Sequence, residues 1–252
     1  MTFRPQLAIR FTKGGKKFTL AEGATHVDTF HDIRKPAFTL AEVLVTLGII
    51  GVVAAMTLPS IITSFQKKAV AAKLKKFYST MNQVVNRATV DYGDVRYWLP
   101  ERKYATYEEA LFYLQTYIFP YLSYLYYVKA IDTNGSEHVA VYLPSGGMFI
   151  FYIDINGADI IYYIDGNPYN RTVKNRFAFQ FNKVNGFNIE TNQQIIRHQY
   201  TTFIEPYTYG WTGEYEDLKN NHRGCRMGNS NCLFCTKLIQ MNDWEISDDY
   251  PW

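Results

Sequence analysis

Hydrophobic and polar positions divide the chain into a long apolar run, an amphipathic stretch and a body of short alternating segments. The apolar run covers residues 38–58 and contains one charged side chain, Glu42. As an α-helix it would be about 31 Å long, which is close to the hydrocarbon thickness of a bilayer. We therefore expect a membrane-spanning helix. A secretory signal peptide fits poorly, because the run begins late and no small-residue cleavage pattern follows it.

Beyond Pro59 the pattern becomes that of a helix with one apolar face. Apolar residues recur at spacings of three and four: Leu74, Phe77/Tyr78, Met81, Val84/Val85 and Ala88. We expect this face to pack on a sheet and the helix to stop at Gly93. Pro59 lacks a backbone N–H and should kink the helix.

The body of the chain combines helical and strand patterns. Residues 104–129 indicate one or two helices interrupted at Pro120. Strands follow at 138–143, 148–154, 159–164 and 177–183, with further short strands near 195–203. Gly, Pro, Asn and Asp separate the first four strands. The pattern predicts an α+β fold in which an antiparallel meander follows a long helix.

The charge of the chain is unevenly distributed. Residues 1–37 carry seven Lys/Arg against three Asp/Glu, and residues 38–76 carry five Lys against Glu42. Residues 77–252 carry 14 basic against 19 acidic side chains. Positive charge thus surrounds the apolar run, which indicates a membrane surface and no nucleic-acid partner. No P-loop, dinucleotide fingerprint, HExxH or GxSxG occurs, so we expect neither an enzyme nor a cofactor.

The stretch "RKPAFTLAEVLVTLGIIGVVAAMTLP", residues 34–59, resembles the N-terminus of type IV prepilins and of type II secretion pseudopilins. The resemblance implies that residues 1–37 are a cytoplasmic leader. A prepilin peptidase would cut between Ala37 and Phe38 and then methylate the Phe38 amine. Ala37 stands where the family usually has Gly, and the leader is long. The pentapeptide FTLAE also occurs at residues 18–22, where a polar stretch follows it, and we assign that copy no role.

The resemblance also implies an architecture and partners. Residues 38–59 would form the transmembrane and filament-core helix, 60–92 its amphipathic continuation, and 93–252 a pilin-like head. Glu42 would pair with the Phe38 amine of a neighbouring subunit. Partners would be other pilin or pseudopilin subunits, an inner-membrane assembly platform and the lipid bilayer. The head would be periplasmic or extracellular, although counting Lys residues at 67–76 by the positive-inside rule favours the opposite orientation.

The C-terminal region holds the three cysteines, Cys225, Cys232 and Cys235, close to His222. An H-x2-C…C-x2-C pattern is compatible with a Cys3His zinc site. The resemblance favours a C-terminal disulfide instead, in oxidising space. Because adjacent CxxC cysteines rarely pair structurally, Cys225 should bond to Cys235 or Cys232. We favour Cys225–Cys235, which leaves Cys232 free or intermolecular.

A second candidate metal site lies in "DINGAD", where Asp154, Asn156 and Asp159 present oxygen ligands at a spacing that would suit calcium. A hairpin turn built on Asn-Gly explains the same residues without a metal.

The sequence therefore predicts a structural subunit of a pilus or pseudopilus, with a minor subunit favoured by the large aromatic head. The alternatives are a pilin-like binding module for DNA uptake or adhesion, and a membrane-anchored zinc protein.

Overall fold

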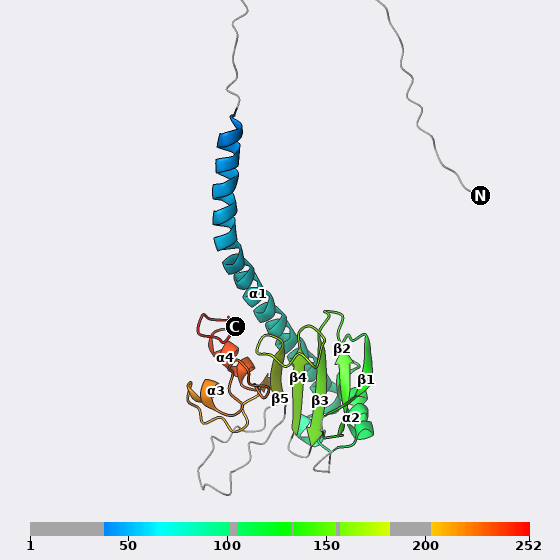
Figure 1. Cartoon of the computed structure of the whole chain (residues 1–252). Helices are drawn as coiled ribbons and strands as arrows, with labels where there is room; N and C mark the ends of the chain where they lie inside the picture. The colour runs from blue at the N-terminus through cyan, green and yellow to red at the C-terminus, as the bar shows by residue number, and fades with distance from the viewer. Residues whose placement is uncertain (1–37, 101–104, 133, 155–156, 182–202) are drawn as a thin grey trace, which may run out of the picture. The chain divides into compact units, whose positions relative to one another are not determined.

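A computed structural model describes residues 38–100, 105–132, 134–154, 157–181 and 203–252 (Figure 1). The leader with Ala37 and the first FTLAE copy lies outside the described residues, as do Asn156 and the strands expected near 195–203. The chain divides into two compact units between Val52 and Val53.

The long N-terminal helix α1 runs from Leu40 to Tyr92. It ends where predicted, at Gly93, whose φ of +76° is a left-handed conformation that glycine adopts without strain. The predicted apolar face is confirmed, since the buried side chains of α1 fall on a single stripe. They are Ala71, Leu74, Phe77, Met81, Val84, Val85 and Ala88.

The sheet has six antiparallel strands in sequential order, which confirms the predicted meander. The strands are β1 (Tyr126–Ile131), β2 (Glu137–Tyr142), β3 (Met148–Asp154), β4 (Gly157–Tyr163), β5 (Arg176–Phe181) and β6 (Ile204–Pro206). Together with α1 they make the α+β, pilin-like architecture expected from the sequence.

The prediction of helix throughout residues 104–129 is wrong at its C-terminal end. Helix α2 covers Tyr107–Tyr113, and a π-helical turn, η2, covers Leu114–Ile118. The chain then leaves the helix around Pro120 and enters β1, which pairs with β2 from Tyr126↔Tyr142 to Ile131↔Glu137. The tyrosine-rich periodicity of this stretch suits either structure, and the long-range pairing with β2 decides for a strand.

The core lies between α1 and one face of the sheet. Phe77 of α1 stacks on Tyr162 of β4 with 4.1 Å between ring centroids, and it also contacts Phe149 of β3 and Phe179 of β5. Because side chains alternate along a strand, the neighbours of these residues point to the opposite face. Helix α4 (Cys235–Met241) contacts β5 and β6, at one end of the sheet (Figure 1).

Candidate functional site

The apolar first part of α1 leaves its large side chains exposed. Leu44, Leu47 and Ile50 are about three-fifths exposed, and no residue of the most apolar 18-residue window of α1 is buried. Among the described helices, α1 is long and apolar enough to cross a membrane. A folded chain in water would not keep so many apolar side chains exposed along one segment, so this segment requires an apolar environment from outside the chain.

Two glycines interrupt the apolar surface of this segment. A Cβ added at Gly48 or Gly51 would meet no atom within 4 Å. Each glycine costs a helix roughly 0.5–1 kcal/mol relative to alanine, and none of the residues that the structure describes packs against either position to offset that cost. Small residues on a helix surface allow another helix to approach closely inside a membrane or an assembly.

The start of α1 is closed by a capping box between Thr39 and Glu42. The Glu42 carboxylate accepts hydrogen bonds from the Thr39 backbone N–H at 2.8 Å and from its hydroxyl at 2.9 Å. In return, the Glu42 N–H donates to Thr39 Oγ1 at 3.2 Å. Phe38 lies just outside the helix with its side chain 85% exposed. Glu42 therefore has a local partner, and it occupies the helix end where a negative charge is favourable.

The sequence analysis missed this cap, although Thr39-x-x-Glu42 is its sequence signature.

Pro59 lies inside α1 as expected. Without an N–H it cannot donate to the carbonyl of Ala55, four residues back. The Thr63 hydroxyl donates to the Pro59 carbonyl at 2.9 Å, which adds a bond one turn further along. The kink itself stays a prediction.

The C-terminal cysteines form one disulfide, between Cys225 and Cys235, which is the pairing that the sequence analysis favoured. Cys232 is a free, buried thiol. Burial raises the pKa of the Cys232 thiol, while the nearby Arg176 opposes that shift, so the group stays protonated at neutral pH.

The zinc alternative is wrong for this oxidised chain. Two of its four proposed ligands, Cys225 and Cys235, are joined to each other and have no thiolate to offer. Within the described residues, which include His222, no group of three or more His, Cys, Asp or Glu side chains is placed to hold a metal ion.

The calcium prediction gains no support either. Asp154 pairs with Gly157 at the β3–β4 hairpin, and Asp159 pairs with Tyr152 further along the ladder. Asn156 lies outside the described residues. The arrangement of the described strands is that of the hairpin turn considered as the alternative.

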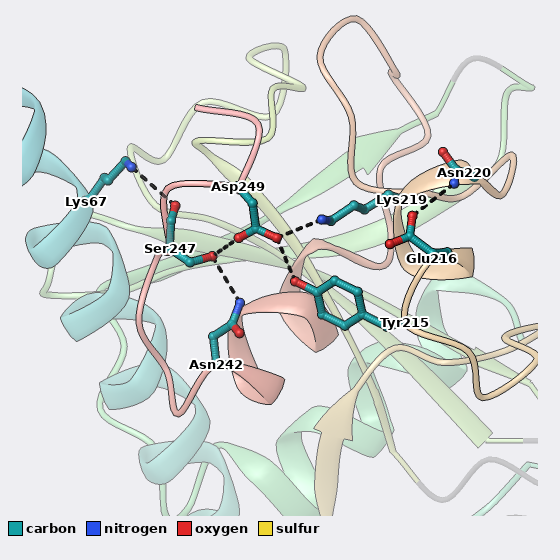
Figure 2. Close-up of polar contacts among 8 residues, drawn as sticks. All are labelled: Lys67, Tyr215, Glu216, Lys219, Asn220, Asn242, Ser247 and Asp249. Atoms are coloured by element: carbon teal, nitrogen blue, oxygen red, sulfur yellow. Dashed lines mark hydrogen bonds and ion pairs between the residues drawn. The ribbon is translucent and has the colours of Figure 1, made fainter.

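The C-terminal tail is held in place by a polar network that the sequence did not indicate (Figure 2). The Asp249 carboxylate accepts hydrogen bonds from Lys219 Nζ at 2.7 Å, from the Tyr215 hydroxyl at 2.9 Å and from the Ser247 hydroxyl. Lys67 of α1 donates to the Ser247 carbonyl at 3.2 Å. These contacts fasten the tail to the part of α1 that belongs to the same unit.

Aromatic packing also holds the C-terminal tail, residues 242–252, in place. Tyr250 is buried and its hydroxyl donates to the carbonyl of Val173, so the tail packs on the head. Trp244 packs against Tyr78 of α1 with ring centroids 4.7 Å apart.

Comparison with known proteins gives two matches. Residues 60–252 match a family of unknown function, DUF6613. Residues 34–58 match the prokaryotic N-terminal methylation motif, the leader signature of prepilins and pseudopilins. No curated protein and no solved structure matches the chain.

Proposed function

Because this chain belongs to the DUF6613 family and carries the prokaryotic N-terminal methylation motif ahead of a pilin-like fold, we propose that it is a structural subunit of a type IV pilus or type II secretion pseudopilus. In this proposal a prepilin peptidase cuts between Ala37 and Phe38 and methylates the new amine. The chain is then a substrate of an enzyme and has no enzymatic activity of its own.

The observation that carries the proposal is the exposed apolar segment that makes up most of the motif. Burial of apolar surface is worth roughly 25 cal/mol per Å², so exposure of this whole segment to water would be strongly unfavourable. A bilayer covers the segment before assembly, and the helices of neighbouring subunits cover it afterwards. Gly48 and Gly51, against which no atom of the described residues packs, support close packing between such helices.

Glu42 has a second role in this proposal. A carboxylate within an apolar segment is costly, by about 2.5 kcal/mol or more at depth, unless it has a partner. In the single chain the Thr39 cap supplies hydrogen bonds but no charge. During assembly the methylated amine of a neighbour's Phe38 supplies the charge, and because the pair forms only in one register it also selects that register.

The disulfide supports the proposed location of the head. Disulfides persist in oxidising compartments, so Cys225–Cys235 favours a periplasmic or extracellular head and a cytoplasmic leader, with one pass through the inner membrane. Assembly would then involve an inner-membrane platform and other pilin or pseudopilin subunits. The large aromatic head favours a minor subunit that is present in few copies.

The first test is the N-terminal mass of the full chain purified from membranes that contain a prepilin peptidase. We expect a mature chain that begins at methylated Phe38, and an intact chain when the peptidase is inactive. A chain that still begins at Met1 in the presence of an active peptidase contradicts the proposal, as does a cut before the first FTLAE copy at Phe18.

Glu42 can be tested with two variants that separate its cap from its charge. Glu42→Gln keeps the capping box, because glutamine also suits that position, but it removes the charge. Thr39→Ala removes the hydroxyl of the cap and keeps the charge. We expect both variants to be inserted and cleaved, and Glu42→Gln to be largely excluded from filaments while Thr39→Ala is incorporated. Equal incorporation of Glu42→Gln and the wild type, measured by immunoblotting sheared filaments, contradicts the charge pairing.

A further inference from the structure

A groove runs between the part of α1 that follows the apolar segment and the C-terminal tail. Its volume is about 700 Å³, within the range of small-molecule sites, and it belongs to the unit that begins at Val53. Ser60 and Ser64 line it from α1, and Glu245 and Asp248 line it from the tail. All four side chains are exposed, so a ligand can reach both walls of the groove.

The two walls of the groove carry opposite charges. Three lysines line the α1 wall: Lys67, Lys68 and Lys75. No acidic residue occurs on α1 from residue 43 to residue 90. The tail wall carries Glu245 and Asp248, and no Lys or Arg occurs from residue 242 to residue 252. A ligand with one negative and one positive group therefore matches the groove better than a ligand with a single charge does.

Most of these charges have no partner in the described part of the chain. Lys67 forms the one ion pair that joins the two walls among the described residues, with Asp248 Oδ1 at 3.2 Å. Because the Asp248 side chain is fully exposed, this pair contributes little and a ligand can exchange with it. Lys68, Lys75 and Glu245 form no ion pair with any described residue. These groups are therefore available to a ligand.

The tail wall is held in place before any ligand binds. Lys67 also donates to the carbonyl of Ser247, which lies between the two acidic residues of the wall (Figure 2). Asn242 donates to the Ser247 hydroxyl at 3.1 Å, and Trp244 packs on Tyr78 of α1. A groove whose walls are already fixed loses little conformational entropy when a ligand binds.

The groove begins where the apolar segment ends. Pro59 and Ser60 line its first part, directly after Leu58, the last residue of the apolar run. At 1.5 Å per residue, Ser64 lies about 9 Å and Lys68 about 15 Å beyond Leu58 along the helix. The headgroup layer on each side of a bilayer is about 5–8 Å thick, and a long lysine side chain reaches back toward it. The groove therefore opens at the level of the phospholipid headgroups.

We propose that this groove binds the headgroup of a phospholipid that carries a primary ammonium group, as phosphatidylethanolamine does. The phosphate accepts hydrogen bonds from Lys68 and from the Ser60 and Ser64 hydroxyls. The ammonium donates to the Glu245 and Asp248 carboxylates. The acyl chains continue along the exposed apolar side chains that precede the groove on α1. This inference rests on the membrane-anchoring part of the proposed function and gives that anchor a specific lipid partner.

Other sources of phosphate match the two walls less well. The trimethylammonium group of phosphatidylcholine has no N–H to donate to the carboxylates. Phosphatidylglycerol has no positive group for them, and they repel its negative charge. Free phosphoethanolamine has both charged groups, but it lacks the acyl chains that would cover apolar surface on α1.

The test is native mass spectrometry of the full chain in a maltoside detergent. The probes are phosphatidylethanolamine, phosphatidylcholine and phosphatidylglycerol with identical acyl chains, and free phosphoethanolamine. We expect phosphatidylethanolamine to bind about fivefold more tightly than the other two lipids, and at least about tenfold more tightly than the free headgroup. Equal binding of the three lipids, or tighter binding of either of the other two, overturns the proposal. Equal or tighter binding of free phosphoethanolamine overturns the lipid as the source of the headgroup.

Matched variants that each remove one charge place the site. Lys68→Gln should weaken the binding of phosphatidylethanolamine about fivefold. Lys73→Gln, at an exposed lysine of α1 outside the groove, should change it less than twofold. Glu245→Gln should bring phosphatidylethanolamine down to nearly the affinity of phosphatidylcholine. All three side chains are exposed, so none of the variants should unfold the head. Equal weakening by the two lysine variants, or an unchanged preference between the two lipids in Glu245→Gln, shows that the headgroup does not bind in the groove.

These outcomes can be told apart from failure of the proposed function. The wild type and all variants should resist extraction from membranes by alkaline carbonate and should be cleaved before Phe38. A chain that is anchored and cleaved but prefers no headgroup overturns this inference alone. A wild-type chain that carbonate extracts contradicts the membrane anchor, and with it both the proposed function and the lipid partner.

Discussion

Two stretches of the same helix, residues 40–52 and residues 71–88 of α1, have the same backbone geometry and different surroundings. The first presents large apolar side chains to the exterior around its whole circumference. The second buries one stripe of seven apolar side chains and keeps four lysine and arginine side chains outside that stripe: Lys73, Lys75, Lys76 and Arg87. The chain therefore stabilises the second stretch by itself, whereas the first depends on lipid or on other subunits.

The difference teaches that hydrophobicity alone does not say what a helix packs against. The periodicity of the apolar residues indicates the packing partner. An apolar stripe on one side of a helix packs on one sheet, whereas a helix that is apolar all round packs in a bilayer or a helix bundle. Each half of the comparison can be tested by changes that should affect only one of the two stretches.

The largest expected effect is from Phe77→Ala in the second stretch. Phe77 is 4% exposed and packs against three aromatic rings of the sheet, so its loss leaves a cavity. We expect the free energy of unfolding of the head to fall by about 3–5 kcal/mol. Leu47→Ala, at a residue that is 60% exposed in the first stretch, should change it by less than about 0.5 kcal/mol. Urea denaturation of the full chain in detergent, followed by near-UV circular dichroism, measures both; similar losses in the two variants contradict the comparison.

The disulfide should have the next largest effect, and again only on the head. Cys225 and Cys235 are ten residues apart, and closing a loop of that size stabilises a domain by about 2–3 kcal/mol. We expect the double variant Cys225→Ala/Cys235→Ala to lower the head's free energy of unfolding by that amount. As a control, a reductant should destabilise the wild type and leave the double variant unchanged. Sensitivity of the double variant to the reductant would mean that another thiol bond contributes.

A pair of glycines compares the packing of the two units directly. A Cβ at Gly147 would come within 2.7 Å of the Tyr162 ring, which is buried and stacked on Phe77 and has little room to move. Gly147→Ala should therefore destabilise the head by about 1–3 kcal/mol. Gly51→Ala, where a Cβ meets nothing within 4 Å, should leave the head's unfolding unchanged. Thermal unfolding of the two variants, measured side by side, tests this difference in Tm. An equal shift in Tm contradicts the assignment of Gly51 to an interface outside the chain.

The sequence predicts elements that have strong local periodicity and misses those set by long-range contacts. The buried stripe of α1, its end at Gly93 and strands β2 to β5 follow from periodicity and turn residues. The residues of β1 have no clear alternation, since both of its faces are largely exposed, and only pairing with β2 makes them a strand.

The same distinction applies to the candidate sites. The motif at residues 34–58 is local and recognisable, and so is the Thr39 cap once its spacing is noticed. The Asp249 network joins residues 30 or more positions apart. No local pattern indicates such sites, because their geometry exists only after the sheet has formed.

The smallest expected effect is on how the stability of the head depends on pH through the Asp249 carboxylate. Hydrogen bonds from Lys219, Ser247 and Tyr215 hold the pKa of Asp249 well below its usual range near 3.9. A carboxyl whose pKa is depressed by folding stabilises the head above its unfolded pKa, and this contribution is lost as the pH falls below about 4. Because Asp249 is largely exposed, solvent screening keeps the contribution small.

We therefore expect Asp249→Asn to have a slightly lower Tm than the wild type at pH 6, with the difference shrinking progressively between pH 5 and pH 3. Lys219→Gln removes the largest cause of the shift and should reproduce most of this behaviour. Residues 40–52 contain only Glu42 as an ionisable group, so their helicity in detergent should not follow the Asp249 titration. Thermal unfolding across this pH range, monitored by near-UV circular dichroism for the head, measures the effect. A constant Tm difference from pH 6 to pH 3 would show that Asp249 acts through packing and not through its charge.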